Sequence, residues 1–171
     1  MKDKVVDKRE SGMLVTTGLQ GVGKTYQNMH LIYNYTKDDI VKRKKGRKCL
    51  IMDTNGEYNK EEFENNGIQN FDPKILAVKD VAAWCKVPGG ECRRIDAKSL
   101  GLDEKKKITE YLLKSFRNGL LVLEDINNYI IDVSHMQDIV GGLINLRHRA
   151  LDVLISYQSL RPVEPRIFQN A

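Results

Sequence analysis

A glycine-rich octapeptide at residues 18–25, Gly-Leu-Gln-Gly-Val-Gly-Lys-Thr, leaves this chain few folds to adopt. It matches the pattern G-x-x-x-x-G-K-[ST] at every fixed position. The apolar run Met13–Thr17 before it predicts a buried strand, and the residues from about Lys24 to Tyr35 predict a helix. A glycine loop between a strand and a helix points its backbone N–H groups at phosphate oxygens. The sequence therefore predicts a nucleotide-binding loop in an α/β domain.

Each residue type in this loop has its own expected role in binding the nucleotide. Gly18, Gly21 and Gly23 let the backbone turn tightly toward the phosphates. Lys24 is expected to bridge the β- and γ-phosphates of ATP, and the hydroxyl of Thr25 is expected to bind Mg²⁺. The expected nucleotide contacts are Gly18, Gln20, Gly21, Val22, Gly23, Lys24, Thr25 and Tyr26.

Strands and helices alternate along the rest of the chain. This alternation predicts a single α/β P-loop NTPase domain over residues 1–171, with a mostly parallel central sheet flanked by helices. Residues 1–10 are expected to form a flexible, charged N-terminus. The further elements expected are strands at Lys48–Asp53, Lys74–Val78, Cys92–Ile95, Leu120–Leu123 and Asp152–Tyr157, a turn at 88–90, and helices over Asp103–Arg117 and after Ser134.

Two acidic residues follow the apolar run Leu120–Leu123. A P-loop enzyme needs an acid at the end of a neighbouring strand to hold magnesium through water. By position, Glu124 would serve the metal, and Asp125 would orient or deprotonate the attacking water. The more usual order is Asp then Glu, so the division of labour stays open. Asp125 as a simple cap of the following turn is the alternative.

Gln158 ends the strand Asp152–Tyr157, where a polar side chain can respond to the γ-phosphate. The alternative is a glutamine that only ends a strand. A regulatory GTPase would carry Asn-Lys-x-Asp, and the nearest match, at 59–62, lacks the aspartate. The extra strand at Lys48–Asp53 and the second acid beside the metal ligand favour an ATPase that carries its own catalytic acid.

Composition excludes several classes. Three cysteines without paired spacing argue against a disulfide framework and for reduced thiols in the cytoplasm. No apolar run approaches the ~20 residues of a membrane span. The net charge is +5, which suits a polyanionic partner such as DNA. The basic clusters at 42–48 and 105–107 are candidate contacts, and the alternative for the first is a solvated loop.

At three segments the chain resembles the FtsK–HerA superfamily of DNA-pumping ATPases, and within it the viral packaging ATPases. These are the octapeptide at 18–25, the segment Leu50–Tyr58 that ends in Asp-Thr-Asn-Gly-Glu-Tyr, and the stretch Leu120–Asn170, with Arg-His-Arg before the last strand. Together they cover most of the chain except about residues 60–118.

The resemblance implies a RecA-like fold, ATP hydrolysis with Mg²⁺, and sequence-independent translocation of double-stranded DNA through a homo-oligomeric ring, a pentamer or hexamer. For a viral packaging motor it also implies a portal or capsid vertex as a further partner, and a place in the host cytoplasm or on the virion.

Family members also use an arginine that reaches the neighbouring subunit's site, and Arg147 and Arg149 are the matching positions. Both precede the last strand, so about 20 Å of strand separates them from the subunit's own phosphates. Only another subunit's ATP would be in reach. The alternative for each is a structural ion pair.

Other functions stay open at this stage. A HerA-like cellular translocase or a DNA-export ATPase belongs to the same class. A nucleoside or metabolite kinase, and a nucleotide switch that recruits a partner without turnover, belong to different classes.

Overall fold

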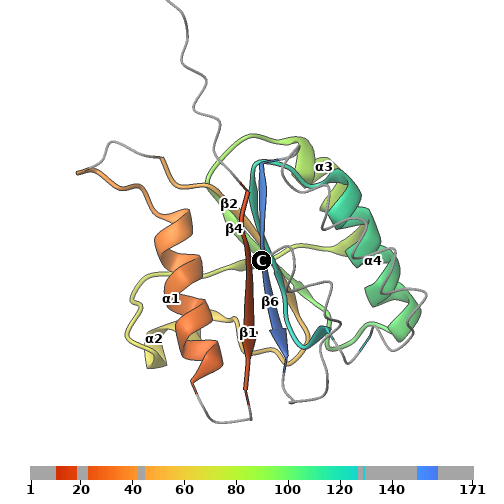
Figure 1. Cartoon of the computed structure of the whole chain (residues 1–171), viewed down its shortest axis with the longest axis horizontal. Helices are drawn as coiled ribbons and strands as arrows, with labels where there is room; N and C mark the ends of the chain where they lie inside the picture. The colour runs from red at the N-terminus through yellow and green to blue at the C-terminus, as the bar shows by residue number, and fades with distance from the viewer. Residues whose placement is uncertain (1–10, 19–22, 42–44, 127–128, 130–149, 158–171) are drawn as a thin grey trace, which may run out of the picture.

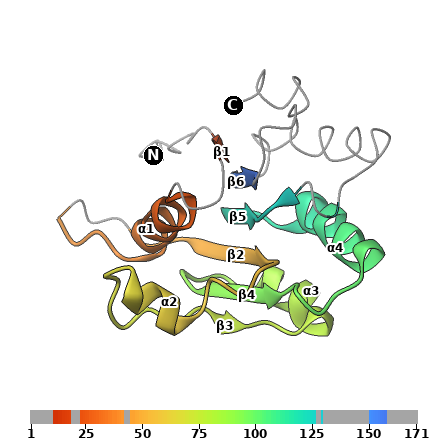
Figure 2. The same ribbon diagram turned by 90° about the horizontal axis from the view of Figure 1, so that it is seen from below.

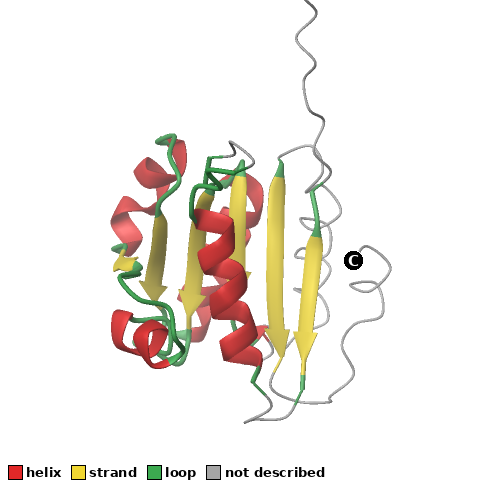
Figure 3. Cartoon of the chain, turned by 90° about the vertical axis from the view of Figure 1, so that its left-hand side faces the viewer, coloured by secondary structure: helices red, strands yellow, loops and turns green. Residues whose placement is uncertain are grey.

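The computed structural model describes residues 11–18, 23–41, 45–126, 129 and 150–157. Within them lies one six-stranded sheet in the order β1-β6-β5-β2-β4-β3. Figure 2 shows the strands in this order, from β1 at the top to β3 at the bottom. Every pair of neighbouring strands is parallel, and Figure 3 shows the strands running side by side in one direction. The strands are β1 (Met13–Thr17), β2 (Lys48–Asp53), β3 (Lys74–Ile75), β4 (Cys92–Asp96), β5 (Gly119–Leu123) and β6 (Leu151–Tyr157).

Helices cover both faces of the sheet. Figure 1 shows α1 and α2 on one side of the strands and α3 and α4 on the other. The helices are α1 (Lys24–Thr36), α2 (Lys60–Asn65), α3 (Val81–Lys86) and α4 (Leu102–Ser115), with a short 3₁₀ turn at Val78–Asp80. Among the described residues, no helix has the length and apolarity that a membrane crossing requires.

Consecutive residues of a strand pack into two separate apolar cores, because side chains alternate between the two faces of a sheet. On one face Leu50 and Leu121 belong to the apolar cluster that includes Leu112 of α4. On the other face Ile51 packs in the cluster that includes Met29 of α1. All six residues of β2 are buried, as expected for a central parallel strand covered on both sides.

The α/β P-loop fold predicted from the sequence is confirmed, and the sheet is wholly parallel. β1 and β2 have the expected bounds, and β5 and β6 each begin one residue early. The strand expected over Lys74–Val78 is wrong beyond Ile75, because the chain enters the 3₁₀ turn at Val78. The helix expected after Ser134 lies outside the described residues.

Two short helices were not anticipated. α2 begins where the sequence came nearest to a guanine-binding motif: the side chain of Asn59 accepts the backbone N–H of Glu62 at 3.0 Å and so caps the helix. α3 follows the 3₁₀ turn directly.

Two cations of the basic cluster at 42–48 serve the fold. Arg47 donates to Asp152 at 2.8 Å, and the Nζ of Lys48 lies 4.2 Å from the centre of the Trp84 ring. Lys48 is also buried. These two residues therefore hold strand ends in place, which removes them from the candidate DNA contacts.

Gly119 at the start of β5 offers a test of the β2–β5 pairing. A Cβ on this residue would lie 2.8 Å from the carbonyl oxygen of Lys48 in β2 and 2.6 Å from Cζ of Phe116. Gly119→Ala should therefore lower the free energy of unfolding by about 1–3 kcal/mol in chemical denaturation. Gly12→Ala is the matched control, because its nearest neighbour would be Oδ1 of Asp152 at 3.8 Å. Equal stability of the two variants would contradict the close strand contact.

Candidate nucleotide site

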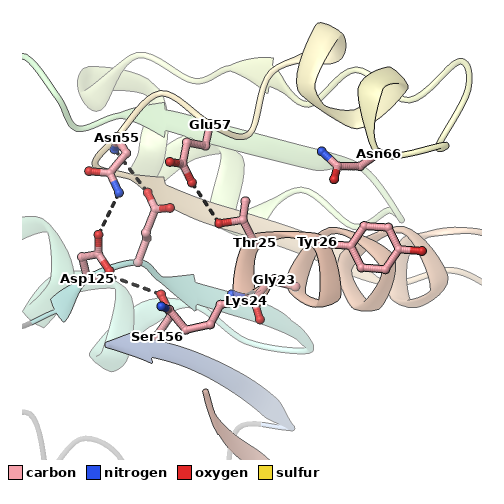
Figure 4. Close-up of a pocket in the computed structure, with 11 residues that line it drawn as sticks. Gly23, Lys24, Thr25, Tyr26, Asn55, Glu57, Asn66, Asp125 and Ser156 are labelled. Carbon is pink, nitrogen blue, oxygen red and sulfur yellow. Dashed lines mark hydrogen bonds between the residues drawn. The ribbon is translucent and has the colours of Figure 1, made fainter. Parts of the chain in front are cut away.

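Segments that belong to or follow α1, β2, α2, β5 and β6 meet in a cavity of about 290 Å³ at the carboxyl edge of the sheet (Figure 4). The start of α1, the loop after β2 and the end of β5 provide most of the lining. Asn66 at the end of α2 and Ser156 of β6 complete it. Parallel strands bring their carboxyl ends to one edge, which is why residues far apart in sequence meet there. The lining residues are Gly23, Lys24, Thr25, Tyr26, Asn28, Asn55, Glu57, Asn66, Glu124, Asp125 and Ser156.

The start of α1 is shaped to receive an anion. Gly23 is the N-cap residue in the left-handed region at φ 82°, which favours glycine, and it has no side chain to cap the helix. The first turn of α1 contains no acidic residue. Its N–H groups therefore suit the oxygens of a phosphate, and the helix dipole favours negative charge at the same place. Lys24 reaches back across the loop, where its Nζ donates to the carbonyl of Gly18 at 2.6 Å.

The carboxylate of Asp53, the last residue of β2, binds the backbone of the loop that follows this strand. One carboxylate oxygen of this residue accepts the N–H groups of Gly56 at 2.8 Å and Glu57 at 3.0 Å, and the other accepts Tyr58 at 3.3 Å. Arg94 of β4 donates to the second oxygen at 3.1 Å. Burial raises the pKa of the Asp53 carboxyl, although these hydrogen bonds and Arg94 act to lower it. The loop is thus folded around one buried carboxylate.

Glu124 is fixed by the same loop. Its Oε2 accepts the backbone N–H of Thr54 at 2.9 Å, the hydroxyl of Thr54 at 3.2 Å and the N–H of Asn55 at 3.2 Å. The residue is only 3% exposed. Burial raises the pKa of Glu124 to about 8, and the neighbouring carboxylates of Asp53, Asp125 and Glu57 add to this shift. A nearby cation would favour the ionised form.

Asp125 has an unusual backbone conformation for a residue with a side chain. Its φ is 43°, in the left-handed region that aspartate tolerates better than most residues. Its N–H donates to the hydroxyl of Ser156 at 3.3 Å, and its Oδ2 accepts the side-chain amide of Asn55 at 2.7 Å. Figure 4 shows Asn55 and Ser156 meeting this residue from opposite sides. The two strands that flank β5 thus contribute to its placement, β6 directly and β2 through the loop that follows it.

Thr25 and Glu57 meet across the cavity. The hydroxyl of Thr25 donates to Oε2 of Glu57 at 2.9 Å, as the dashed line in Figure 4 marks. Among the described residues, no group of three His, Cys, Asp or Glu side chains is placed to hold a metal by itself. Mg²⁺ in nucleotide sites usually keeps several waters and binds one or two protein oxygens besides the phosphates. The oxygens of Thr25, Glu57 and Glu124 fit that role.

The cavity brings together six residues that the sequence predicts for the site: Gly23, Lys24, Thr25, Tyr26, Glu124 and Asp125. Gly18 contacts Lys24 at the other end of the loop. Gln20, Gly21, Val22, Arg147, Arg149 and Gln158 lie outside the described residues.

Sequence reasoning missed Asn55, Glu57 and Ser156 as site residues. Asn55 and Glu57 follow a fully buried strand, and a polar residue in that position is a readable signal once the strand is expected to be parallel. Ser156 lies within β6, and only the pairing of β6 with β5 brings it to Asp125.

No protein-family model matches the sequence, and a search of curated proteins finds no match either. Solved structures share the fold. The genome packaging NTPase B204 from Sulfolobus turreted icosahedral virus 2, in complex with ATP-gammaS, gives a TM-score of 0.56 at 14% sequence identity, over 94% of this chain and 71% of that chain. The same protein in complex with AMPPCP gives 0.54 at 14%, over 96% and 72%. At such identities the likeness shows a shared RecA-like α/β fold.

Ionisation of Glu124 should make the nucleotide-free protein less stable as the pH rises. Its pKa is about 8 in the fold against 4.5 ordinarily, so the folded state holds the proton more tightly between these values. The contribution of this group to the free energy of unfolding is therefore complete below about pH 4.5 and is lost as the pH rises to about 8. Glu124→Gln, which has the same shape without the charge, should flatten this decline in chemical denaturation across that range.

Glu110→Gln on α4 is the matched control and should keep the decline of the original protein. If the decline survives Glu124→Gln unchanged, other groups are responsible for it.

Proposed function

We propose that this chain is a Mg²⁺-dependent ATPase whose subunits form a ring and translocate double-stranded DNA, in viral genome packaging. One observation carries the ATPase part. The start of α1, with Lys24 and Thr25, faces the acids Glu124 and Asp125 across a single cavity. This arrangement provides a phosphate-binding end and an acidic end within reach of the same small molecule.

The phosphate end would work through backbone and charge. The N–H groups at the start of α1 would donate to the β-phosphate oxygens. Lys24 would move its ammonium from the carbonyl of Gly18, now 2.6 Å away, to the β- and γ-phosphates. The hydroxyl of Thr25 would turn from Glu57 toward the metal. Mg²⁺, when bound with ATP, would offset the charge that develops on the transferred phosphoryl group.

The acidic end would place the water. Asp125 would orient or deprotonate the water. Its carboxylate lines the cavity and accepts a hydrogen bond from the side chain of Asn55. Glu124 would serve the metal through water, held in place by the Thr54 and Asn55 N–H groups. Burial raises the pKa of Glu124, and a nearby positive charge would favour its ionised form, which suits a residue facing a metal.

Three observations support the DNA part of the proposal. The chain carries a net charge of +5, which favours a polyanion. The segments Leu50–Tyr58 and Leu120–Asn170 resemble packaging ATPases, and the fold is shared with one such NTPase. In a pentameric or hexameric ring, Arg147 or Arg149 would act on the neighbouring subunit's ATP, and a portal or capsid vertex would be a further partner. A HerA-like cellular translocase is the alternative role within this class.

Steady-state ATP hydrolysis against protein concentration, with and without long double-stranded DNA, tests the motor. We expect the rate per subunit to rise steeply with concentration and to increase with DNA. Arg147→Ala or Arg149→Ala should lower kcat by roughly 10³–10⁵-fold, because a trans arginine stabilises the transition-state charge. The affected variant should still bind ATP.

Lys24→Ala is the control that sets the background rate, since it removes the phosphate-binding ammonium. A rate per subunit that is flat with concentration, ignores DNA and survives both arginine substitutions would contradict the ring. That outcome would favour transfer of the phosphoryl group to an acceptor other than water, as in a nucleoside or metabolite kinase.

A further inference from the structure

The side chain of Asn55 forms a hydrogen bond that the fold itself does not require. Its Nδ2 donates to Oδ2 of Asp125 at 2.7 Å, from the loop after β2 to the end of β5. The two residues are far apart in sequence and meet because β2 and β5 are neighbours in the sheet. This distance lies at the short end of the usual range for an N–H donor and an oxygen acceptor.

The loop does not depend on this bond for its shape. Its backbone is held by the carboxylates of Asp53, which binds Gly56 and Glu57, and of Glu124, which binds Thr54 and the N–H of Asn55. The Asn55 side chain takes part in none of these contacts. It is therefore directed at Asp125 from a loop that is already fixed.

Asp125, which accepts this bond, has a backbone that its neighbours place closely. It directly follows Glu124, it has a left-handed backbone at φ 43°, and its N–H reaches across to Ser156 on β6. The backbone alone sets where the side chain starts, and a carboxylate can still rotate about its own bonds. A donor at one oxygen restricts that rotation and sets the direction of the remaining lone pairs.

From this geometry we infer that Asn55 is a positioning residue, which holds the carboxylate of Asp125 in the orientation that attack by water requires. The inference rests on the proposed ATPase function. It gives the loop after β2 a part in hydrolysis besides the support that its backbone gives Glu124. A displacement of about 1 Å at a reacting group can cost on the order of 100-fold in rate.

Steady-state kinetics of Asn55→Ala and Asn55→Asp provide the test. We expect Asn55→Ala to lower kcat by roughly 10–100-fold while KM and the dissociation constant of a fluorescent ATP analogue change by less than about twofold. Asn55→Asp keeps the shape but replaces the amide donor with a carboxylate, so it should lower kcat at least as much. A packing role would be preserved in Asn55→Asp, which would then retain activity and overturn the inference.

A double substitution separates positioning from general damage. In an Asp125→Asn background, Asn55→Ala should cause little further loss, since the carboxylate that it orients is gone. Losses that multiply in the double variant would overturn the inference. Asn59→Ala is the matched control in the same segment. It removes the cap of α2 without contact to either acid, and should lower the melting temperature while kcat stays within about twofold.

The two proposals fail in different ways. If the original protein hydrolyses ATP and both Asn55 variants match its kcat, the positioning role is wrong and the ATPase stands. If the original protein hydrolyses no nucleoside triphosphate above the Lys24→Ala background, the ATPase is wrong. The role of Asn55 is overturned with it, because no water attack remains for Asp125 to serve.

Discussion

The carboxylate of Asp53 lies at the end of β2 with none of its surface exposed, and three consecutive N–H groups, those of Gly56, Glu57 and Tyr58, donate to it. A buried carboxylate costs several kcal/mol unless it is hydrogen-bonded and paired. Arg94 supplies the pair from β4. The resulting loop presents Thr54 and Asn55 to the two acids that follow β5, and Glu57 to Thr25. β4, which contributes no lining residue to the cavity, is therefore part of what shapes it.

The order of the strands explains why the acids are held from two sides. β5 lies between β2 and β6, with Leu123 paired to Met52 on one side and to Ile155 on the other. The residues that follow Met52 and Ile155 therefore flank Glu124 and Asp125. A doubly wound parallel sheet places such strand ends at one edge, where polar groups can meet without interrupting the apolar cores beneath them. The pairing of strands thus decides which loops can cooperate.

Much of this arrangement could be read from the sequence, because local patterns determine it. The octapeptide predicts strand, loop and helix. The runs at 48–53 and 120–123 predict buried strands, and two acids follow the second of them. Strand order could not be read, since long-range packing decides it. For this reason the contact of Asn55 with Asp125 was not foreseen. The strand at Lys74 was predicted too long because Lys74–Val78 is largely apolar, yet Ile75 and Val78 are exposed and only Leu76 is buried.

Four carboxylates lie in or directly beneath the cavity, those of Asp53, Glu57, Glu124 and Asp125. The other three raise the pKa of Glu124 and so oppose its ionisation. A bare nucleoside triphosphate would bring several more negative charges to this place, so Coulomb repulsion would oppose its entry. A divalent cation reverses the sign of that interaction, because it attracts the acids and the phosphates alike. The site is thus expected to bind a nucleotide in complex with a divalent metal more tightly than the same nucleotide without the metal. This selectivity for the metal–nucleotide complex would come from electrostatics alone and would not depend on contacts with the base or the sugar.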